Sequence, residues 1–219
     1  GVTGRVGTGK TTLMRTLLGL LPPDARKVRW NGGAIDNLAT YMIPPRVAYT
    51  PQLPALFSET LVANILSGQP PTVSDLEGAI HAAVMEQDVP QLDHGLETLI
   101  GPRGVKLSGG QRQRTAAARM FVREPELLVF DDLSSALDVE TERKLWERLF
   151  TRSGQTCLVV SHRRAALRRA DHIIVLKEGA ILDEGRLDEL LGRCSEMQEL
   201  WRGDGEQEVA FQPNRSMTA

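Results

Sequence analysis

Eight residues near the start of the chain constrain its fold more than any other part of the sequence. They read Gly4-Arg5-Val6-Gly7-Thr8-Gly9-Lys10-Thr11 and fit the pattern G-x-x-x-x-G-K-[ST]. The glycines let the backbone approach a ligand closely, and successive backbone N–H groups then form an anion-binding nest at the start of a helix. The pattern therefore predicts an α/β fold with a phosphate-binding loop between a strand and a helix.

The same motif assigns two side chains to a nucleotide. Lys10 is expected to reach the β- and γ-phosphates, and the Thr11 hydroxyl is expected to ligate Mg²⁺. Asp131 ends an apolar run, where an unpaired carboxylate would be costly, so we expect it to contact the magnesium through water.

Five further motifs follow the phosphate loop in a fixed order. They are Ala48-Tyr49-Thr50-Pro51-Gln52, Leu107-Ser108-Gly109-Gly110-Gln111, Leu127-Leu128-Val129-Phe130-Asp131, Ser135-Ala136-Leu137-Asp138 and Val159-Val160-Ser161-His162. In this order they resemble the Q-loop, signature, Walker B, D-loop and switch-histidine motifs of the nucleotide-binding domain of ATP-binding cassette (ABC) proteins. The segment Leu56–Ile65 resembles the exporter type of this domain, and the resemblance extends to about residue 202.

This resemblance implies a fold and a domain plan. The fold is that of a P-loop NTPase, with a mainly parallel sheet core flanked by helices and a helical subdomain that carries the signature. The expected segments are a first part of the RecA-like ATP-binding core, a helical subdomain and a second part of the core, at residues 1–52, 53–122 and 123–202. Residues 203–219 are mostly polar and aperiodic, which predicts a disordered tail. Because only Gly1-Val2-Thr3 precede the loop, we expect an N-terminally truncated domain that lacks an upstream β region and an adenine-stacking aromatic residue.

Periodicity places these motifs on elements. Helices are predicted at Lys10–Leu20, Thr60–Leu66, Ser74–Val84, Gly109–Val122 and Glu140–Ser153, and one or two surface helices at Leu187–Trp201. Strands are predicted at Val28–Asn31, Arg46–Tyr49, Leu127–Asp131 and Cys157–Ser161, with a hairpin of Ile173–Leu176 and Ala180–Asp183. We expect Pro22-Pro23 to stop the first helix, and Ser74-x-x-Glu77 to form a capping box.

The resemblance also assigns roles to single residues. Nucleotide contacts fall to Gly4, Gly7, Thr8, Gly9, Lys10, Thr11 and Thr12, and to Ser108, Gly109, Gly110, Gln111 and Asp138. Magnesium falls to Thr11, Gln52 and Asp131, and catalysis to Asp132, His162 and Gln52. The implied cofactors are ATP and Mg²⁺.

The signature implies a partner. Ser108 is a good N-cap, and the following glycines expose backbone N–H groups, so this helix start is a second anion site. One ATP molecule does not need two such sites in one domain. In ABC proteins the signature faces the phosphate loop of a second, identical or related, nucleotide-binding domain, and transmembrane domains complete a transporter at the cytoplasmic face of the membrane.

Composition agrees with a globular domain of this kind. The 219 residues are 41% hydrophobic and carry a formal net charge of −2. The charge favours no nucleic-acid partner. No apolar run approaches the about 18 residues that cross a bilayer.

Two departures from the ABC pattern keep alternatives open. Asp132 stands where the general base is usually Glu, and Ile100-Gly101-Pro102-Arg103-Gly104 lacks the Glu that exporters commonly carry before the signature. The leading interpretation is the ATPase domain of an exporter, slow if Asp132 is a poor base. The others are a hydrolysis-impaired regulatory half of a heterodimeric exporter and a soluble ABC ATPase.

Overall fold

The computed structural model describes residues 1–22, 27–70, 75–102, 104–151 and 155–210, with side chains through residue 203 in the last segment. These residues form two compact units. We call Gly1–Lys10 with Val160–Ala219 the phosphate-loop unit, and Thr11–Val159 the signature unit. Expectations placed on Pro23, Ser74, Arg103, Ser153 and residues 211–219 lie outside the described residues.

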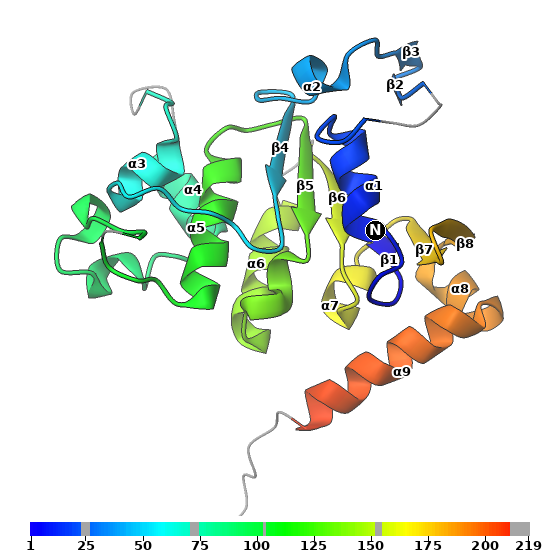
Figure 1. The fold of residues 1–219 in the computed structure, drawn as a ribbon. Coiled ribbons are helices and arrows are strands. Elements are labelled where there is room, and N and C mark those ends of the chain that lie inside the picture. The colour runs from blue at the N-terminus through cyan, green and yellow to red at the C-terminus, as the bar shows by residue number, and fades with distance from the viewer. Residues whose placement is uncertain (23–26, 71–74, 103, 152–154, 211–219) are drawn as a thin grey trace, which may run out of the picture. The chain divides into compact units, whose positions relative to one another are not determined.

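The signature unit contains parallel strands. β4 (Val47–Thr50) pairs with β5 (Leu127–Asp131) in parallel, in a register that aligns Val47 with Leu127, and β6 (Thr156–Val160) follows β5 in strand order. β4 and β5 are almost wholly buried, as expected for strands covered on both faces. A separate antiparallel pair consists of β2 (Arg29–Trp30) and β3 (Gly33–Ala34). Figure 1 shows β4 and β5 side by side.

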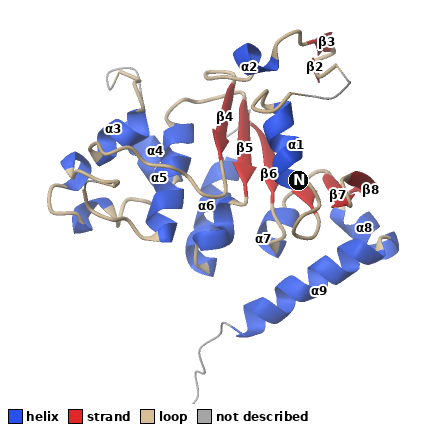
Figure 2. Cartoon of the chain, in the orientation of Figure 1, coloured by secondary structure: helices blue, strands red, loops and turns tan. Residues whose placement is uncertain are grey.

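Helices make up the rest of this unit. They are α1 (Lys10–Leu17, whose first residue belongs to the other unit), α2 (Leu38–Tyr41), α3 (Leu61–Leu66), α4 (Leu76–Ala82), η2 (Val89–Gln91), η3 (Gly95–Glu97), α5 (Gly109–Phe121), η4 (Leu133–Ala136) and α6 (Val139–Thr151). Between β4 and β5 the described chain consists of helices, turns and loops (Figure 2). The boundaries 53–122 of a helical subdomain remain a prediction.

The first helix ends earlier than its apolar pattern predicts. α1 stops at Leu17, and Gly19 follows with φ +70°. The Leu20 N–H donates to the Arg15 carbonyl at 2.8 Å, closing the last turn around that glycine. A left-handed glycine, and not Pro22-Pro23, therefore ends the helix.

The cap of α4 also differs from the prediction. Asp75, directly after the undescribed Ser74, accepts a hydrogen bond of 2.8 Å from the Gly78 N–H through its side chain. The helix begins one residue later than a Ser74 cap would place it. Its predicted apolar face is correct at Ala79 and Ala83, which are fully buried.

An aromatic series joins α5, β5 and α6. Phe130 of β5 contacts Phe121 of α5 and Trp146 of α6 edge to face, with ring centroids 6.3 and 5.8 Å apart. The indole N–H of Trp146 donates to the Glu142 carboxylate at 3.2 Å, which satisfies that buried donor. This core fixes the strand that ends in Asp131 against the helix that begins with the signature.

The phosphate-loop unit is built on parallel strands and a hairpin. β1 (Val2–Thr3) pairs in parallel with Val160 at the end of β6 and with β7 (Ile173–Lys177). β8 (Ala180–Gly185) pairs with β7 in antiparallel fashion, which confirms the predicted hairpin. The other elements of this unit are α7 (Arg164–Leu167), α8 (Leu187–Arg193) and α9 (Ser195–Ala210).

The last helix corrects one expectation. α9 continues to Ala210, so residues 203–210 are helical where the sequence predicts a disordered tail. Its first turns are anchored, because Met197 is buried in a cluster with Leu190, Ile173 and Val175. A helix with a packed start propagates at little further cost, even through polar residues.

These observations confirm the α/β class with mainly parallel strands and flanking helices. Among the described residues, no helix combines the length and the apolar character that crossing a membrane requires.

Candidate functional site

The predicted phosphate loop lies between β1 and α1. A Cβ on Gly4 would come within 2.3 Å of the Leu176 carbonyl oxygen, so only glycine fits there. Gly7 and Gly9 have φ of +83° and +90°, a region that side chains disfavour. A Cβ on Gly7 would meet no heavy atom within 4 Å, so the loop is open above this residue.

Lys10 is directed back onto the loop. Its Nζ donates to the carbonyls of Gly4 and Arg5, each at 2.7 Å. The Arg5 carbonyl also accepts from the Thr8 hydroxyl at 2.9 Å and from the Thr8 N–H at 3.3 Å. The loop therefore holds its cation through its own carbonyls, and the Arg5 carbonyl is the common acceptor. Thr12, two residues after Lys10, is exposed.

Thr11 and Asp131 meet within the signature unit. The Thr11 hydroxyl donates to Asp131 Oδ1 at 3.2 Å, and the Tyr49 hydroxyl lies 3.5 Å from Asp131 Oδ2. Burial raises the pKa of Tyr49, and the negative charge of Asp131 raises it further. A hydroxyl and a carboxylate are hard oxygen ligands of the type that Mg²⁺ takes together with substrate phosphates. The described residues contain no group of three or more His, Cys, Asp or Glu that could together hold a metal ion, and a magnesium ion bound by a hydroxyl, a carboxylate and substrate phosphates does not need one.

Asp132 is held in an unusual backbone conformation. It has φ +55° and ψ +48°, directly after the end of β5. Gln52 Nε2 donates to Asp132 Oδ2 at 3.3 Å, so the structure brings these two predicted catalytic residues together. Asp132 Oδ1 is buried without a hydrogen-bond partner in the described part of the chain. A buried, unsatisfied carboxylate oxygen is a group that a water molecule would satisfy.

His162 belongs to the phosphate-loop unit and is exposed. It follows β6, and the N–H of Ser161 donates to the Val2 carbonyl of β1 at 3.1 Å. Carboxyl ends of parallel strands meet at one edge of a sheet, so His162 and the phosphate loop leave the same edge of this unit.

The signature residues form the predicted helix start. The N–H of Gln111 donates to the Ser108 hydroxyl at 3.1 Å, and the N–H of Ser108 donates to Gln111 Oε1 at 3.0 Å. This reciprocal pair is a capping box. Ser108 and Gly109 are exposed, whereas Gly110 approaches the Ala136 carbonyl of η4 so closely that a Cβ there would lie 3.1 Å from it.

Sequence reasoning missed the residues that support this cap. Arg114 forms a bidentate ion pair with Asp88 at 2.7–3.0 Å, and both side chains are only 12–13% exposed. Gln111 Nε2 donates to the same carboxylate at 3.3 Å, which fixes which way its amide points. Arg114 could have been suspected only because it lies about one helical turn after Gln111 on the predicted signature helix. The residues around Asp88 carry no local pattern that indicates an ion pair.

Two further links connect the motifs within the signature unit. Gln113 Nε2 donates to the Gln52 carbonyl at 2.6 Å and ties the Q-loop to α5. Asp138 Oδ1 accepts from the N–H of Thr141 at 2.9 Å and so caps α6. Partial burial raises the pKa of Asp138, but the hydrogen bonds from Thr141 outweigh it, and the pKa is lowered overall.

The segment that resembles the exporter type is organised by one buried side chain. The Asn64 amide bonds both the N–H and the carbonyl of Phe57, at 2.9 and 3.1 Å. Arg119 of α5 donates to the Asn64 carbonyl at 2.8 Å. The spacing from Phe57 to Asn64 thus closes a loop onto α3 and fastens it to the signature helix.

Comparison with known proteins agrees with this geometry. A family model described as ABC transporter matches residues 1–135. The chain belongs to the ABC transporter family.

Individual ABC relatives are of the exporter type. The chain is 38% identical over 193 residues to the probable multidrug resistance ABC transporter ATP-binding/permease protein YheI of Bacillus subtilis, covering 87% of the chain and 33% of the relative. It is 39% identical over 189 residues to the ATP-dependent lipid A-core flippase of Burkholderia thailandensis, covering 86% and 32%. A structure of a bacterial Atm1-family ABC exporter with ATP bound matches with a TM-score of 0.86 at 30% identity, covering 93% of this chain and 36% of that one. The chain thus spans about a third of the length of these ABC proteins.

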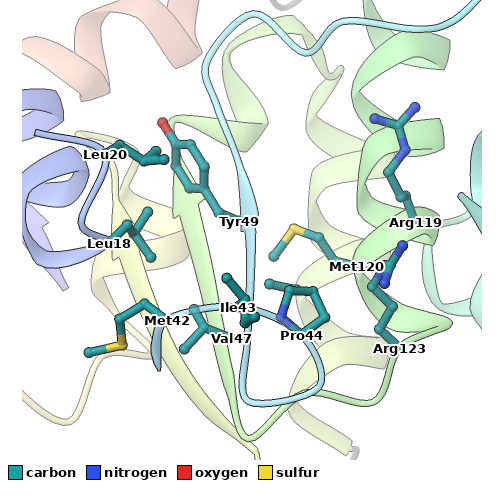
Figure 3. Close-up of a pocket in the computed structure, with 11 residues that line it drawn as sticks. Leu18, Leu20, Met42, Ile43, Pro44, Val47, Tyr49, Arg119, Met120 and Arg123 are labelled. Atoms are coloured by element: carbon teal, nitrogen blue, oxygen red, sulfur yellow. The ribbon is translucent and has the colours of Figure 1, made fainter. Parts of the chain in front are cut away.

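A pocket of about 270 Å³ lies in the signature unit of this ABC domain (Figure 3). It is lined by Leu18, Leu20, Met42, Ile43, Pro44, Val47, Ala48, Tyr49, Arg119, Met120 and Arg123. Leu20 and Ile43 are 60% and 49% exposed, so apolar surface reaches the pocket rim. Tyr49 lines the pocket, and its hydroxyl lies 3.5 Å from Asp131 Oδ2.

Proposed function

We propose that this chain binds MgATP and hydrolyses it as the nucleotide-binding domain of an ABC exporter. The observation that carries the proposal is the contact of Thr11, which follows the loop lysine in sequence, with the buried carboxylate of Asp131. The open space above Gly7 and the unsatisfied Asp132 Oδ1 also fit a nucleotide phosphate and its attacking water.

Each residue has a distinct role in this proposal. Lys10 exchanges the carbonyls of Gly4 and Arg5 for the β- and γ-phosphates, which are stronger acceptors. Thr11 and Gln52 would hold Mg²⁺ through their oxygens, and Asp131 would hold it through water. The bound ion would neutralise the charge that develops on the phosphates during transfer.

The chemical step needs a base. Asp132 accepts the proton of the attacking water, and Gln52 orients the Asp132 carboxylate through its amide N–H. His162 donates to the γ-phosphate from the edge shared with the phosphate loop. Thr8, Gly9 and Thr12 complete the phosphate contacts.

The domain works as a head-to-tail dimer with a second nucleotide-binding domain, identical or related. The N-termini of α1 and α5 are two separate helix starts that suit anions. Ser108, Gly109, Gly110 and Gln111 serve the ATP held by the partner's phosphate loop. Asp138, at the start of α6, couples the two sites.

Transmembrane domains are the other partner, and the chain works at the cytoplasmic face of the membrane. The relatives named above include an ATP-binding/permease protein of which this chain spans a third. We assign the pocket at Leu20 and Ile43 to an apolar segment of these domains. Tyr49 would couple a segment bound in that pocket to Asp131, because it contacts both.

Hydrolysis at this chain's own site is proposed to be slow. The Asp132 carboxylate is one methylene closer to the backbone than that of Glu, and Gln52 already holds one of its oxygens. The same feature supports the second candidate, a regulatory half that binds ATP and leaves turnover to its partner.

Equilibrium binding of a fluorescent ATP analogue, with and without Mg²⁺, tests the proposal. We expect magnesium-dependent binding that Lys10→Ala removes. Single-turnover hydrolysis then separates the ATPase from the regulatory half. A wild-type protein that binds no MgATP would contradict both.

A further inference from the structure

The C-terminal helix α9 reaches the phosphate loop through charge. The Arg5 guanidinium donates to the carboxylates of Glu196 and Glu199, both on α9. Lys177, the last residue of β7, lies 3.2 Å from the other oxygen of Glu196. All four residues belong to the phosphate-loop unit. Glu196 therefore joins two cations from different elements.

The two carboxylates differ in burial. Glu196 is 4% exposed, whereas Glu199 is 57% exposed. A buried carboxylate is costly unless it is paired, and an exposed pair contributes little. The hydrogen bond from Arg5 lowers the pKa of Glu196, which keeps it charged. Glu196 is therefore the carboxylate that determines where the Arg5 side chain lies.

The position of Arg5 matters because its carbonyl organises the loop. That carbonyl accepts from the Thr8 N–H, the Thr8 hydroxyl and Lys10 Nζ. Lys177 ends β7, and the carbonyl of the preceding Leu176 lies so close to Gly4 of the loop that a Cβ there would be 2.3 Å from it. Glu196 thus pairs with one cation of the phosphate loop and with one cation of the strand against which the loop packs.

The same helix supports the segment after the switch histidine. Arg164 donates to the Trp201 carbonyl at 2.6 and 2.9 Å, and its guanidinium lies 4.9 Å from the centroid of the Trp201 ring. Arg164 is the second residue after His162. Two elements that leave the same sheet edge are therefore attached to one helix.

We propose that Glu196 is a positioning residue for the phosphate loop, which it holds in its nucleotide-binding shape through Arg5 and Lys177. The proposal rests on the MgATP binding proposed above. Glu196 touches no substrate. It acts on nucleotide affinity and leaves the chemical step alone.

The test compares Glu196→Gln with Glu199→Gln in the full-length protein. Both changes remove one negative charge from a partner of Arg5 and keep the side-chain shape. We expect Glu196→Gln to raise the KM for MgATP about three- to tenfold, with kcat within about twofold of wild type. Glu199→Gln should change KM by less than about twofold, because its pair is exposed.

Arg5→Gln keeps the test valid if Glu196→Gln does not fold. Arg5 is exposed, and Glu196 keeps Lys177 as a partner in this variant. Arg5→Gln should also raise KM, by no more than Glu196→Gln does, and the double variant should be no worse than Glu196→Gln alone. An unchanged KM in Arg5→Gln, or equal effects of the two glutamate variants, would overturn the proposal.

The outcomes also separate this proposal from the function on which it rests. If wild type binds MgATP, and Lys10→Ala does not, the proposed function stands whatever Glu196→Gln does. A lower melting temperature in Glu196→Gln with an unchanged KM would show that Glu196 only anchors α9, and the positioning role would be wrong.

Discussion

The two glycine-rich helix starts of this chain, the phosphate loop and the signature, are held in different ways. In the phosphate loop, Lys10 donates to the loop's own Gly4 and Arg5 carbonyls. At the signature, side chains make the contacts, because Ser108 and Gln111 cap each other and Gln111 is fixed by Asp88.

This difference predicts different responses to a nucleotide. Contacts between a lysine and neutral carbonyls are readily exchanged for contacts with phosphate, so the phosphate loop adapts to its ligand. A capping box supported by a poorly exposed ion pair is formed before any ligand arrives. We therefore expect ATP to take over the contacts of Lys10 within a loop that Arg5 and Glu196 already support, and the signature to be a preformed surface for a partner.

Lys10→Ala is the change that tests this comparison most strongly. It removes the cation that the loop exchanges, and we expect the affinity for MgATP to fall at least about 100-fold, as the loss of a charge-assisted contact in a desolvated site does. Titration with a fluorescent ATP analogue measures it. Lys144→Ala is the matched control, because Lys144 forms an exposed pair with Glu140 at 3.3 Å and should leave binding unchanged. Unaltered affinity in Lys10→Ala would contradict an adaptable loop.

Ser108→Arg tests the other half of the comparison. A long cation at the start of α5 blocks the preformed surface, and we expect turnover at the partner's ATP to fall about 30-fold or more, of which the lost cap explains only a part. Mixed dimers with a Lys10→Ala partner measure it. Turnover should survive when the two changes are in different subunits and disappear when they share one subunit.

The control for this experiment is Ser108→Thr, which keeps a capping hydroxyl without adding charge. Loss of turnover only when Ser108→Arg shares a subunit with the intact phosphate loop would show that the signature serves its own chain.

Local patterns predicted most of these motifs correctly. The Gly109–Phe121 helix, its Ser108 cap, the 127–131 strand and the terminal hairpin have signals within a few residues, and the structure has all of them. The positions of Asp131 and His162 at strand ends were also predictable, because parallel strands deliver their carboxyl ends to one edge, whereas the roles of these residues stay predictions.

Contacts between distant segments could not be predicted in this way. Glu196 lies 191 residues from Arg5, and its sequence surroundings do not reveal that it is buried. Asp88 looks like a loop residue until α5 brings Arg114 to it. The early end of α1 was missed because a leucine-rich pattern continues past Gly19, whereas the backbone conformation of that glycine decides.

Asp88→Asn sharpens the comparison because it weakens the support of the signature without changing a residue of the signature itself. The change leaves Arg114 without its charged partner at a site that is about one-eighth exposed. We expect the free energy of unfolding to fall by about 2 kcal/mol, below the range for fully buried pairs. Urea unfolding measures it, and the partner's turnover should fall in parallel. Glu140→Gln, which breaks exposed pairs on α6, should leave the free energy of unfolding almost unchanged. Equal effects of the two variants would show that Asp88 does not support the signature.

The smallest expected effect concerns Asp132, in the signature unit. It follows β5, and η4, directly after it, contacts the first residues of α5. Asp is one methylene shorter than Glu, which withdraws the carboxylate by up to about 1.5 Å, one C–C bond length. A general base must lie within about 2.6–3.2 Å of its water, and a misplacement near 1 Å can cost about 100-fold in rate.

Asp132→Glu should therefore speed single-turnover hydrolysis at this chain's own site. We expect a gain of about tenfold and not about 100-fold, because Gln52 must also move to follow the carboxylate. MgATP affinity should change little, since the phosphate loop, Thr11 and Asp131 are untouched. The change has a cost in stability: Asp132 has φ +55°, a conformation that Asp tolerates better than Glu, so the melting temperature should fall slightly. Asp132→Asn, which keeps the size of Asp132 without its charge, is the control and should abolish the chemical step. If the rate in Asp132→Glu stays level or falls while Asp132→Asn is inactive, then the left-handed backbone at this position already presents Asp132 as a full base, and the slow-site hypothesis is wrong.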